Sequence, residues 1–162
     1  IDFTNGALTS FLIRLSTAVE QSDELVIGSY FHVLNDLERI GDHAENFYEI
    51  VVEMSAKGIS FSEKAQKEMD KMRSGILHML AISRDVFDNL NKARLPELSV
   101  LEDEIDGMKK ELTASHFARL AEGSCSMEVS PYYSSTVAGL ERVADHLVNV
   151  GYSIVSPIGS QK

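Results

Sequence analysis

Apolar residues recur along most of the chain at alternating steps of three and four, the spacing that places them on one side of an α-helix. The longest series runs from Val26 to Met54, and others cover 65–90, 98–112 and 137–154. A repeat of about 3.5 residues is typical of the buried seam of a helical bundle. No stretch shows the period-two alternation of a β-strand. The pattern therefore predicts an all-α protein whose apolar seams face a common core.

Residues that start or stop helices divide this pattern. Gly58 is a helix-stop glycine and Ser62 a helix-capping serine, while Pro96 and Pro131 suit the first turn of a helix. Ser22 or Asp23 is an N-cap candidate. These signals predict five helices, over about 4–20, 24–57, 63–92, 96–122 and 129–155. The connections are short, which favours an antiparallel helical bundle.

Composition and net charge limit the kinds of partner that the chain can bind. The chain has 162 residues, 44% of them hydrophobic, and a net charge of −10. Such a charge repels phosphate backbones and anionic lipid, so we expect no nucleic-acid partner. The single cysteine excludes an internal disulfide, and no apolar run approaches the roughly 20 residues of a membrane span. We expect a cytosolic segment of a longer polypeptide, without membrane insertion of its own.

One charged heptapeptide occurs twice. "LERIGDH" at 37–43 returns as "LERVADH" at 140–146. Core packing explains repeated leucines but not a repeated Glu, Arg, Asp and His in fixed order. The short match "ID" at 1–2 and 105–106 extends the similarity upstream. The chain therefore resembles two copies of one helical unit, the first without its beginning.

This duplication predicts the domain organisation. We expect residues 1–58 to form a truncated first repeat of two helices and residues 59–156 a complete second repeat of three helices. Residues 157–162, rich in Pro, Gly and Ser, would form a flexible tail.

Three acidic pairs are spaced four residues apart, so each pair lies on one helix face. They are Glu38 with Asp42, Glu102 with Asp106, and Glu141 with Asp145. Placing the apolar seams inward puts these acids on the outer side of the bundle. They could be the solvated face of an acidic protein. Alternatively, pairs from two neighbouring helices could share a cation, because carboxylates are hard oxygen ligands.

Other chemistry is poorly represented. His43 and His146 follow the aspartates and point to another side of the helix, which favours a structural or solvent role. Arg39 and Arg142 are expected to pair with nearby acids. Cys125 is predicted to lie in a loop beside no base. Glu-x-x-His pairs, phosphate-binding glycine loops and nucleophile elbows are absent, so we predict that the protein is not an enzyme.

The repeated block resembles a known family. "DLERIGDHAEN" and "LERVADHLVN" are similar to the third-helix signature of PhoU domains, and residues 101–154 resemble the second and third helices of one PhoU unit. The segment "RLAEGSCS" is most similar to the cytosolic C-terminal PhoU region of bacterial Na/Pi-cotransporter family proteins. The resemblance implies tandem three-helix bundles that regulate phosphate uptake and bind metal at their surface.

The resemblance also implies the metal ligands. The second site would comprise Glu102, Asp106, Glu141 and Asp145. The first would comprise Asp2, Glu38 and Asp42, and lacks a glutamate expected before Ile1. Family resemblance implies iron or zinc, while the oxygen ligands leave Mg, Ca and Mn open.

The same resemblance implies the partners and the location of the chain. The resemblance implies a membrane transporter domain, in the same chain or separate, and a location at the inner face of the membrane. Homo-oligomerisation is left open. Two alternatives remain: a stand-alone PhoU-type regulator of an ABC phosphate transporter and its signalling, or a structural helical adaptor without metal.

Overall fold

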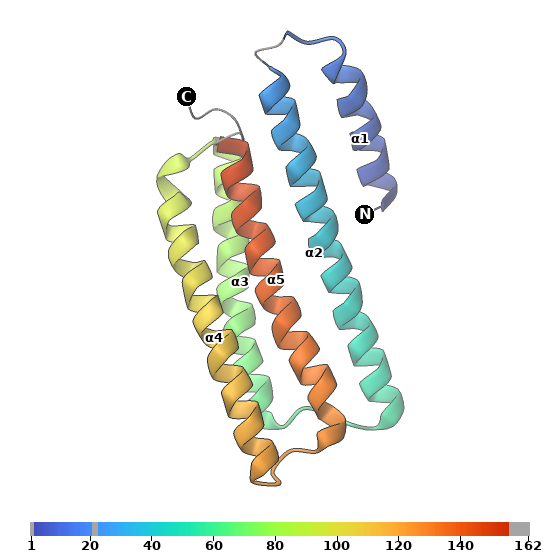
Figure 1. The fold of residues 1–162 in the computed structure, drawn as a ribbon, viewed down its shortest axis with the longest axis vertical. Helices are drawn as coiled ribbons and strands as arrows, with labels where there is room; N and C mark the ends of the chain where they lie inside the picture. Colours follow the sequence, from blue (N-terminus) through green and yellow to red (C-terminus); the bar gives the residue numbers. More distant parts are fainter. Residues whose placement is uncertain (1, 21–22, 156–162) are drawn as a thin grey trace.

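A computed structural model describes residues 2–20 and 23–155 as a set of long helices (Figure 1). The α-helices are α1 Asp2–Ser16, α2 Glu24–Lys57, α3 Glu63–Asn89, α4 Leu95–Ala121 and α5 Ser130–Val155. The short 3₁₀ turns η1 Lys92–Arg94 and η2 Met127–Val129 precede α4 and α5. The described residues contain no strand, and the predicted all-α helical bundle is confirmed. The predicted tail 157–162 lies outside the described residues.

Helix α5 lies at the centre of the arrangement. It packs against α3 and α4 to form an antiparallel three-helix bundle, and α2 runs antiparallel along another side of it. Helix α1 folds back against α2 (Figure 1). None of the helices within 2–20 and 23–155 combines the length and hydrophobicity that a membrane crossing requires.

The core is built mainly from the predicted seams of α3, α4 and α5. Met72, Met79, Ile82 and Leu98 are completely buried, and Leu147 is 2% exposed. The hydroxyl of Ser83, a seam residue of α3, donates to the backbone carbonyl of Leu147 at 2.9 Å. This bond satisfies a polar group that would otherwise be costly to bury.

Most predicted helix ends agree with the structure. Ser62 caps α3 by accepting a hydrogen bond from the Ala65 amide, and Gly58 ends α2 in the left-handed conformation. Pro96 lies in the first turn of α4. Asp23 occupies the N-cap position of α2 without a side-chain capping bond, and Ser22 lies outside the described residues. Helix α1 ends at Ser16 rather than at residue 20, since Thr17 and Ala18 form a turn.

The predicted seam of α2 is only partly buried. Val33 and Met54 are in the core, but Val26, Leu37 and Val51 are 45%, 45% and 64% exposed. The prediction that the whole series faces a core is therefore wrong. Helix α2 has neighbours on fewer sides than α5, so part of its apolar face is open to solvent.

A polar cluster is buried where α3, α4 and α5 meet. Arg119, 4% exposed, donates to Glu68 at 2.7 Å, and the Tyr133 hydroxyl donates to Glu68 at 3.1 Å. The His116 ring stacks on Tyr133 at 4.4 Å between centroids, and burial lowers the pKa of His116. Burial raises the pKa of Tyr133 to about 12, so the phenol keeps its proton. The cluster links three helices through one carboxylate.

The prediction that no base lies beside Cys125 is wrong. The Cys125 sulfur is 4.0 Å from Nδ1 of His116. This contact depends on the turn after α4, which brings the cysteine back over the helix. The His116 Nε2 atom is engaged with the Ser130 hydroxyl at 2.9 Å, and the ring is buried. We assign this histidine to packing.

We expect Glu68→Ala to lower the free energy of unfolding by about 3 kcal/mol, because it leaves the buried Arg119 charge without its partner. Burial alone would raise the pKa of Glu68, but hydrogen bonds from Ser115 and Arg119 outweigh it and lower the pKa. The stabilisation is therefore present above the ordinary carboxyl pKa and is lost as the pH falls through the lowered value. Urea unfolding at neutral and acid pH measures it.

The matched control is Glu63→Ala. Glu63 pairs with Lys67 on the exposed face of α3, where an ion pair contributes less than about 1 kcal/mol. Equal effects of the two substitutions would contradict the structural role of the buried cluster.

Candidate metal centre

Two antiparallel helices bring the predicted acids of the second repeat together. Helix α5 presents Glu141 and Asp145 one turn apart, and the adjacent α4 presents Asp106 with Glu102 one turn before it. Carboxylate oxygens of Asp106, Glu141 and Asp145 all lie within 4.8 Å of one another. All three residues are partly buried. The spacing predicted from sequence therefore produces a convergent cluster.

Glu102 belongs to the same electrostatic environment, although it is not part of that closest group. Burial, followed by the nearby charges of Asp145 and Asp106, raises the pKa of Glu102. Burial and then Glu141 raise the pKa of Asp145. Both shifts mean that the folded arrangement opposes full ionisation of the cluster.

Two basic side chains offset part of this repulsion. The Lys109 ammonium lies 2.8 Å from Glu141 Oε1, and the Arg142 guanidinium lies 3.5 Å from Asp145. The other Glu141 oxygen, Oε2, is buried and accepts no hydrogen bond among the described residues. Arg142 approaches that oxygen only to 3.9 Å. The cluster thus keeps a buried carboxylate oxygen with spare capacity.

The acids predicted for the first site share one hollow. Asp2, Glu38 and Asp42 line it together with Glu45 and Gly41. Within the described residues, however, the oxygens of the first three do not reach the mutual closeness of the second set. The acids of the first set therefore share a hollow, but their oxygens lie farther apart than those of the second set.

The two sets differ in one neighbouring side chain. Asn5 follows Asp2 by three residues, and its amide donates to Glu38 at 2.6 Å. Lys109 follows Asp106 by three residues and contacts Glu141 in the same way. The arginines are equivalent, since Arg39 lies 3.6 Å from Asp42. Sequence reasoning predicted the arginine contacts but missed Asn5 and Lys109, although their spacing from the aspartates places them on the acidic face.

The repeated histidines meet between α2 and α5. The ring centroids of His43 and His146 are 5.9 Å apart. His146 Nδ1 is 2.8 Å from Asp36, and Asn149 also donates to Asp36 at 3.4 Å. These contacts hold the two copies of the repeated motif against each other. Asp36, outside the repeated heptapeptide, was not predicted.

A family comparison now identifies the fold unit. The sequence profile of the PhoU domain matches residues 69–154, slightly more than half of the chain. The chain belongs to the PhoU domain family. The matched region contains α4 and all but the last residue of α5, and so the whole second acidic cluster of this PhoU domain.

One curated relative gives a further comparison. It is the phosphate-specific transport system accessory protein PhoU homolog 1 of Thermotoga maritima, 31% identical over 121 residues. The match covers 75% of this chain and 51% of the relative, so the chain spans about half of that protein's length. No solved structure matches the PhoU chain described here.

The donor set of this PhoU domain fits a hard divalent cation. Two oxygens that bind one Ca²⁺ at about 2.3–2.6 Å are at most about 5 Å apart, and the oxygens of Asp106, Glu141 and Asp145 meet that limit. The buried Glu141 Oε2 atom offers an unused ligand position. Asp106, Glu141 and Asp145 would hold such an ion, with Glu102 beside them.

We expect Lys109→Asn, which copies Asn5 of the other repeat, to lower the stability of the metal-free protein by up to about 1 kcal/mol. The reason is that the Glu141 carboxylate loses its closest cation. The same substitution should tighten Mn²⁺ binding, since the ion no longer competes with an ammonium group. Thermal unfolding in chelator and calorimetric titration with Mn²⁺ measure the two effects.

Lys110→Asn is the matched control. Lys110 is exposed and makes no ion pair with Glu141 among the described residues. If both variants bound Mn²⁺ with the affinity of the unsubstituted protein, Lys109 would have no part in setting that affinity.

Proposed function

We propose that this chain is a cytosolic PhoU-type regulatory domain associated with phosphate transport, which holds metal between α4 and α5. Membership of the PhoU family supports the regulatory role. The observation that carries the metal proposal is the convergence of Asp106, Glu141 and Asp145 within 4.8 Å. We propose regulation rather than catalysis, on the strength of the family membership.

A bound cation would supply positive charge to this cluster. Helices α4 and α5 pack together although four carboxylates lie on their shared face. The added positive charge would offset the repulsion among these carboxylates. Binding would favour the arrangement in which those acids converge, and so would stiffen the α4–α5 contact. Iron or zinc is our first expectation from the family resemblance, with Mg²⁺, Ca²⁺ and Mn²⁺ as oxygen-seeking alternatives.

The attachment to transport is proposed in two forms. In the first, the chain is the C-terminal part of a sodium-dependent phosphate cotransporter and lies at the inner face of the membrane, as the segment "RLAEGSCS" suggests. In the second, it acts as a stand-alone regulator of an ABC phosphate transporter. The relative from Thermotoga maritima, named as an accessory protein of a phosphate-specific transport system, supports the second form.

Metal binding is tested on protein purified without chelator. We expect added Mn²⁺ or Zn²⁺ to raise the melting temperature, because a ligand bound only to the folded state at 100 times its Kd adds about 2.7 kcal/mol. A double variant, Glu141→Gln with Asp145→Asn, should lose this shift and the metal found by elemental analysis. Glu104→Gln, an exposed acid of the same helix as Asp106, should keep both. Unchanged metal content in the double variant would exclude this site.

The regulatory role is tested in cells that lack the gene. We expect uptake of radiolabelled phosphate to lose its normal dependence on external phosphate, because the transporter is no longer restrained. The intact gene should restore that dependence, as should its Glu104→Gln form. Uptake that is identical with and without the gene would contradict the transport role, whatever the metal content of the protein.

A further inference from the structure

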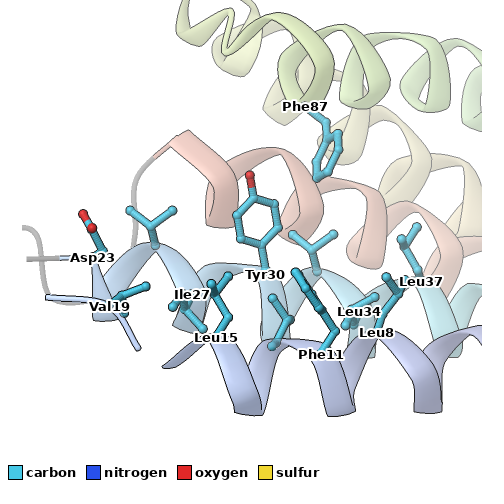
Figure 2. Close-up of a pocket in the computed structure, with 13 residues that line it drawn as sticks. Leu8, Phe11, Leu15, Val19, Asp23, Ile27, Tyr30, Leu34, Leu37 and Phe87 are labelled. Carbon is cyan, nitrogen blue, oxygen red and sulfur yellow. The ribbon is translucent and has the colours of Figure 1, made fainter. Parts of the chain in front are cut away.

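A hollow between α2 and α5, here called the α2–α5 hollow, has a volume of about 440 Å³. Its wall combines an apolar part around Phe47 with a set of polar and charged side chains. These are His43, Asn46, Glu49, Glu53, Tyr132, Ser135 and Arg142. The groove between α1 and α2 is different, since Figure 2 shows Leu8, Phe11 and Tyr30 there and Asp23 is the one charged residue among the described residues that line it. The α2–α5 hollow therefore offers groups that can recognise a polar ligand.

The repeated motif gives this hollow a counterpart elsewhere in the chain. At the offset that aligns the repeated heptapeptides, His43 and Asn46 correspond to His146 and Asn149. In that second copy the two side chains meet one carboxylate. His146 Nδ1 is 2.8 Å from Oδ1 of Asp36, and the Asn149 amide donates to the same oxygen at 3.4 Å. The histidine and asparagine of this motif thus bind an acid in one half of the α2–α5 contact.

The α2–α5 hollow lacks that acid. Gly139 occupies the position that corresponds to Asp36. His43 Nδ1 lies 3.7 Å from where a side chain at 139 would begin, and the Phe47 ring lies 2.7 Å from the same point. Within residues 2–20 and 23–155, the side chains of His43 and Asn46 make no hydrogen bond. The same pair of side chains therefore lines the hollow without a carboxylate from the chain itself.

Arg142 adds positive charge at this end of the hollow. Its guanidinium is 3.5 Å from Asp145 and 3.9 Å from Glu141, and these long contacts use only some of its N–H donors. Burial, followed by His146, lowers the pKa of His43, so the ring is neutral near pH 7 and the charge is that of the guanidinium. A guanidinium beside neutral hydrogen-bonding groups is suited to carboxylate and phosphate oxygens.

The acids of the hollow limit what else a ligand can carry. Glu53 accepts a hydrogen bond from the Tyr132 hydroxyl at 3.0 Å, and Lys57 donates to that hydroxyl at 2.6 Å, so a cation is already near this acid. Glu49 forms no ion pair among the described residues. It would accept a hydrogen bond from a hydroxyl or ammonium group and would repel a second negative charge. The hollow therefore suits one oxyanion group together with a hydrogen-bond donor.

We propose that the α2–α5 hollow binds a small organic molecule through a carboxylate or phosphate group, which His43, Asn46 and Arg142 hold. The body of the molecule would pack against Phe47 and Ile50, which form part of the apolar wall. None of the three polar residues is a carboxylate, so the proposal requires no metal. It is independent of the function proposed above.

Nuclear magnetic resonance tests the proposal on the nitrogen-15-labelled chain after treatment with a chelating resin. Inorganic phosphate and acetate are titrated separately, with chloride keeping the ionic strength constant. We expect saturable shifts of the His43 and Asn46 side-chain signals, with a Kd on the order of millimolar because so small an ion fills little of the hollow.

Saturation with either ion supports the proposal. Saturation with phosphate alone assigns a phosphate-bearing ligand, and saturation with acetate alone assigns a carboxylate-bearing one. Shifts that grow linearly with both ions would overturn the proposal. Saturable shifts that appear only after Mn²⁺ is added would also overturn it, because the anion would then be bound to the metal.

Arg142→Gln should weaken the binding by at least about tenfold, since it removes a charged hydrogen-bond donor. Arg39→Gln is the matched control. Arg39 is the counterpart in the other repeat and contacts Asp42 as Arg142 contacts Asp145, but it does not line the α2–α5 hollow. Both arginines are mostly exposed, so we expect both variants to fold. Equal affinity of the two variants would overturn the proposal.

A double variant, Phe47→Val with Gly139→Asp, copies Val150 and Asp36 of the other half of the contact. The new carboxylate should occupy His43, so the saturable shifts with phosphate and acetate should disappear. Circular dichroism checks that the double variant keeps its helices. A folded double variant that bound either ion as tightly as the unsubstituted chain would overturn the proposal.

Discussion

The packing of α5 against three helices at once is the constraint on which the rest of the structure depends. Helices α2, α3 and α4 all contact it, and apart from Tyr133 its buried positions are small or aliphatic. A side chain at Gly139 would place its first carbon 2.7 Å from Phe47, and one at Gly151 would lie 2.8 Å from Leu98. Such close neighbours leave little of the α5 surface for charged groups. Glu141 and Asp145 lie on what remains, beside α4.

The acidic cluster follows from this placement. Carboxylates confined to the edge of a packed interface cannot separate without moving a helix, so they share one small volume. Lys109 and Arg142 reduce their repulsion, while burial first and then the neighbouring acids keep the pKa values of Glu102 and Asp145 raised. The protein tolerates this cost because the apolar contacts on the other faces of α4 and α5 hold both helices in position. Stability and a cation-binding arrangement are thus provided by different faces of the same helices.

Much of this arrangement could be predicted from the sequence. Strong end signals such as Ser62 and Gly58 placed the boundaries of α2 and α3 well, whereas α1 ends without such a signal and was predicted too long. Periodicity identified the apolar face of α2 correctly. It could not tell whether a neighbour covers that face, because burial depends on other helices.

The residues of the candidate site were likewise predicted only in part. Repetition of Glu, Asp and Arg in fixed order was enough to predict which acids share a face and which arginines pair with them. Lys109, Asn5 and Asp36 were missed, since each acts across a helix–helix contact that no local pattern encodes. His116 beside Cys125 was missed because the contact depends on the course of the turn after α4.

The contact between α2 and α5 has an internal symmetry. Asp36 of α2 meets His146 of α5, and the positions that correspond to them in the other copy are Gly139 and His43. His43 Nδ1 lies 3.7 Å from where a side chain at 139 would begin, so the two halves of the contact are related by an approximate twofold axis. A pair of identical subunits associates in this isologous manner. Joined in one polypeptide, the halves are free to diverge: one keeps a carboxylate for its histidine, while the other has given that space to the Phe47 ring.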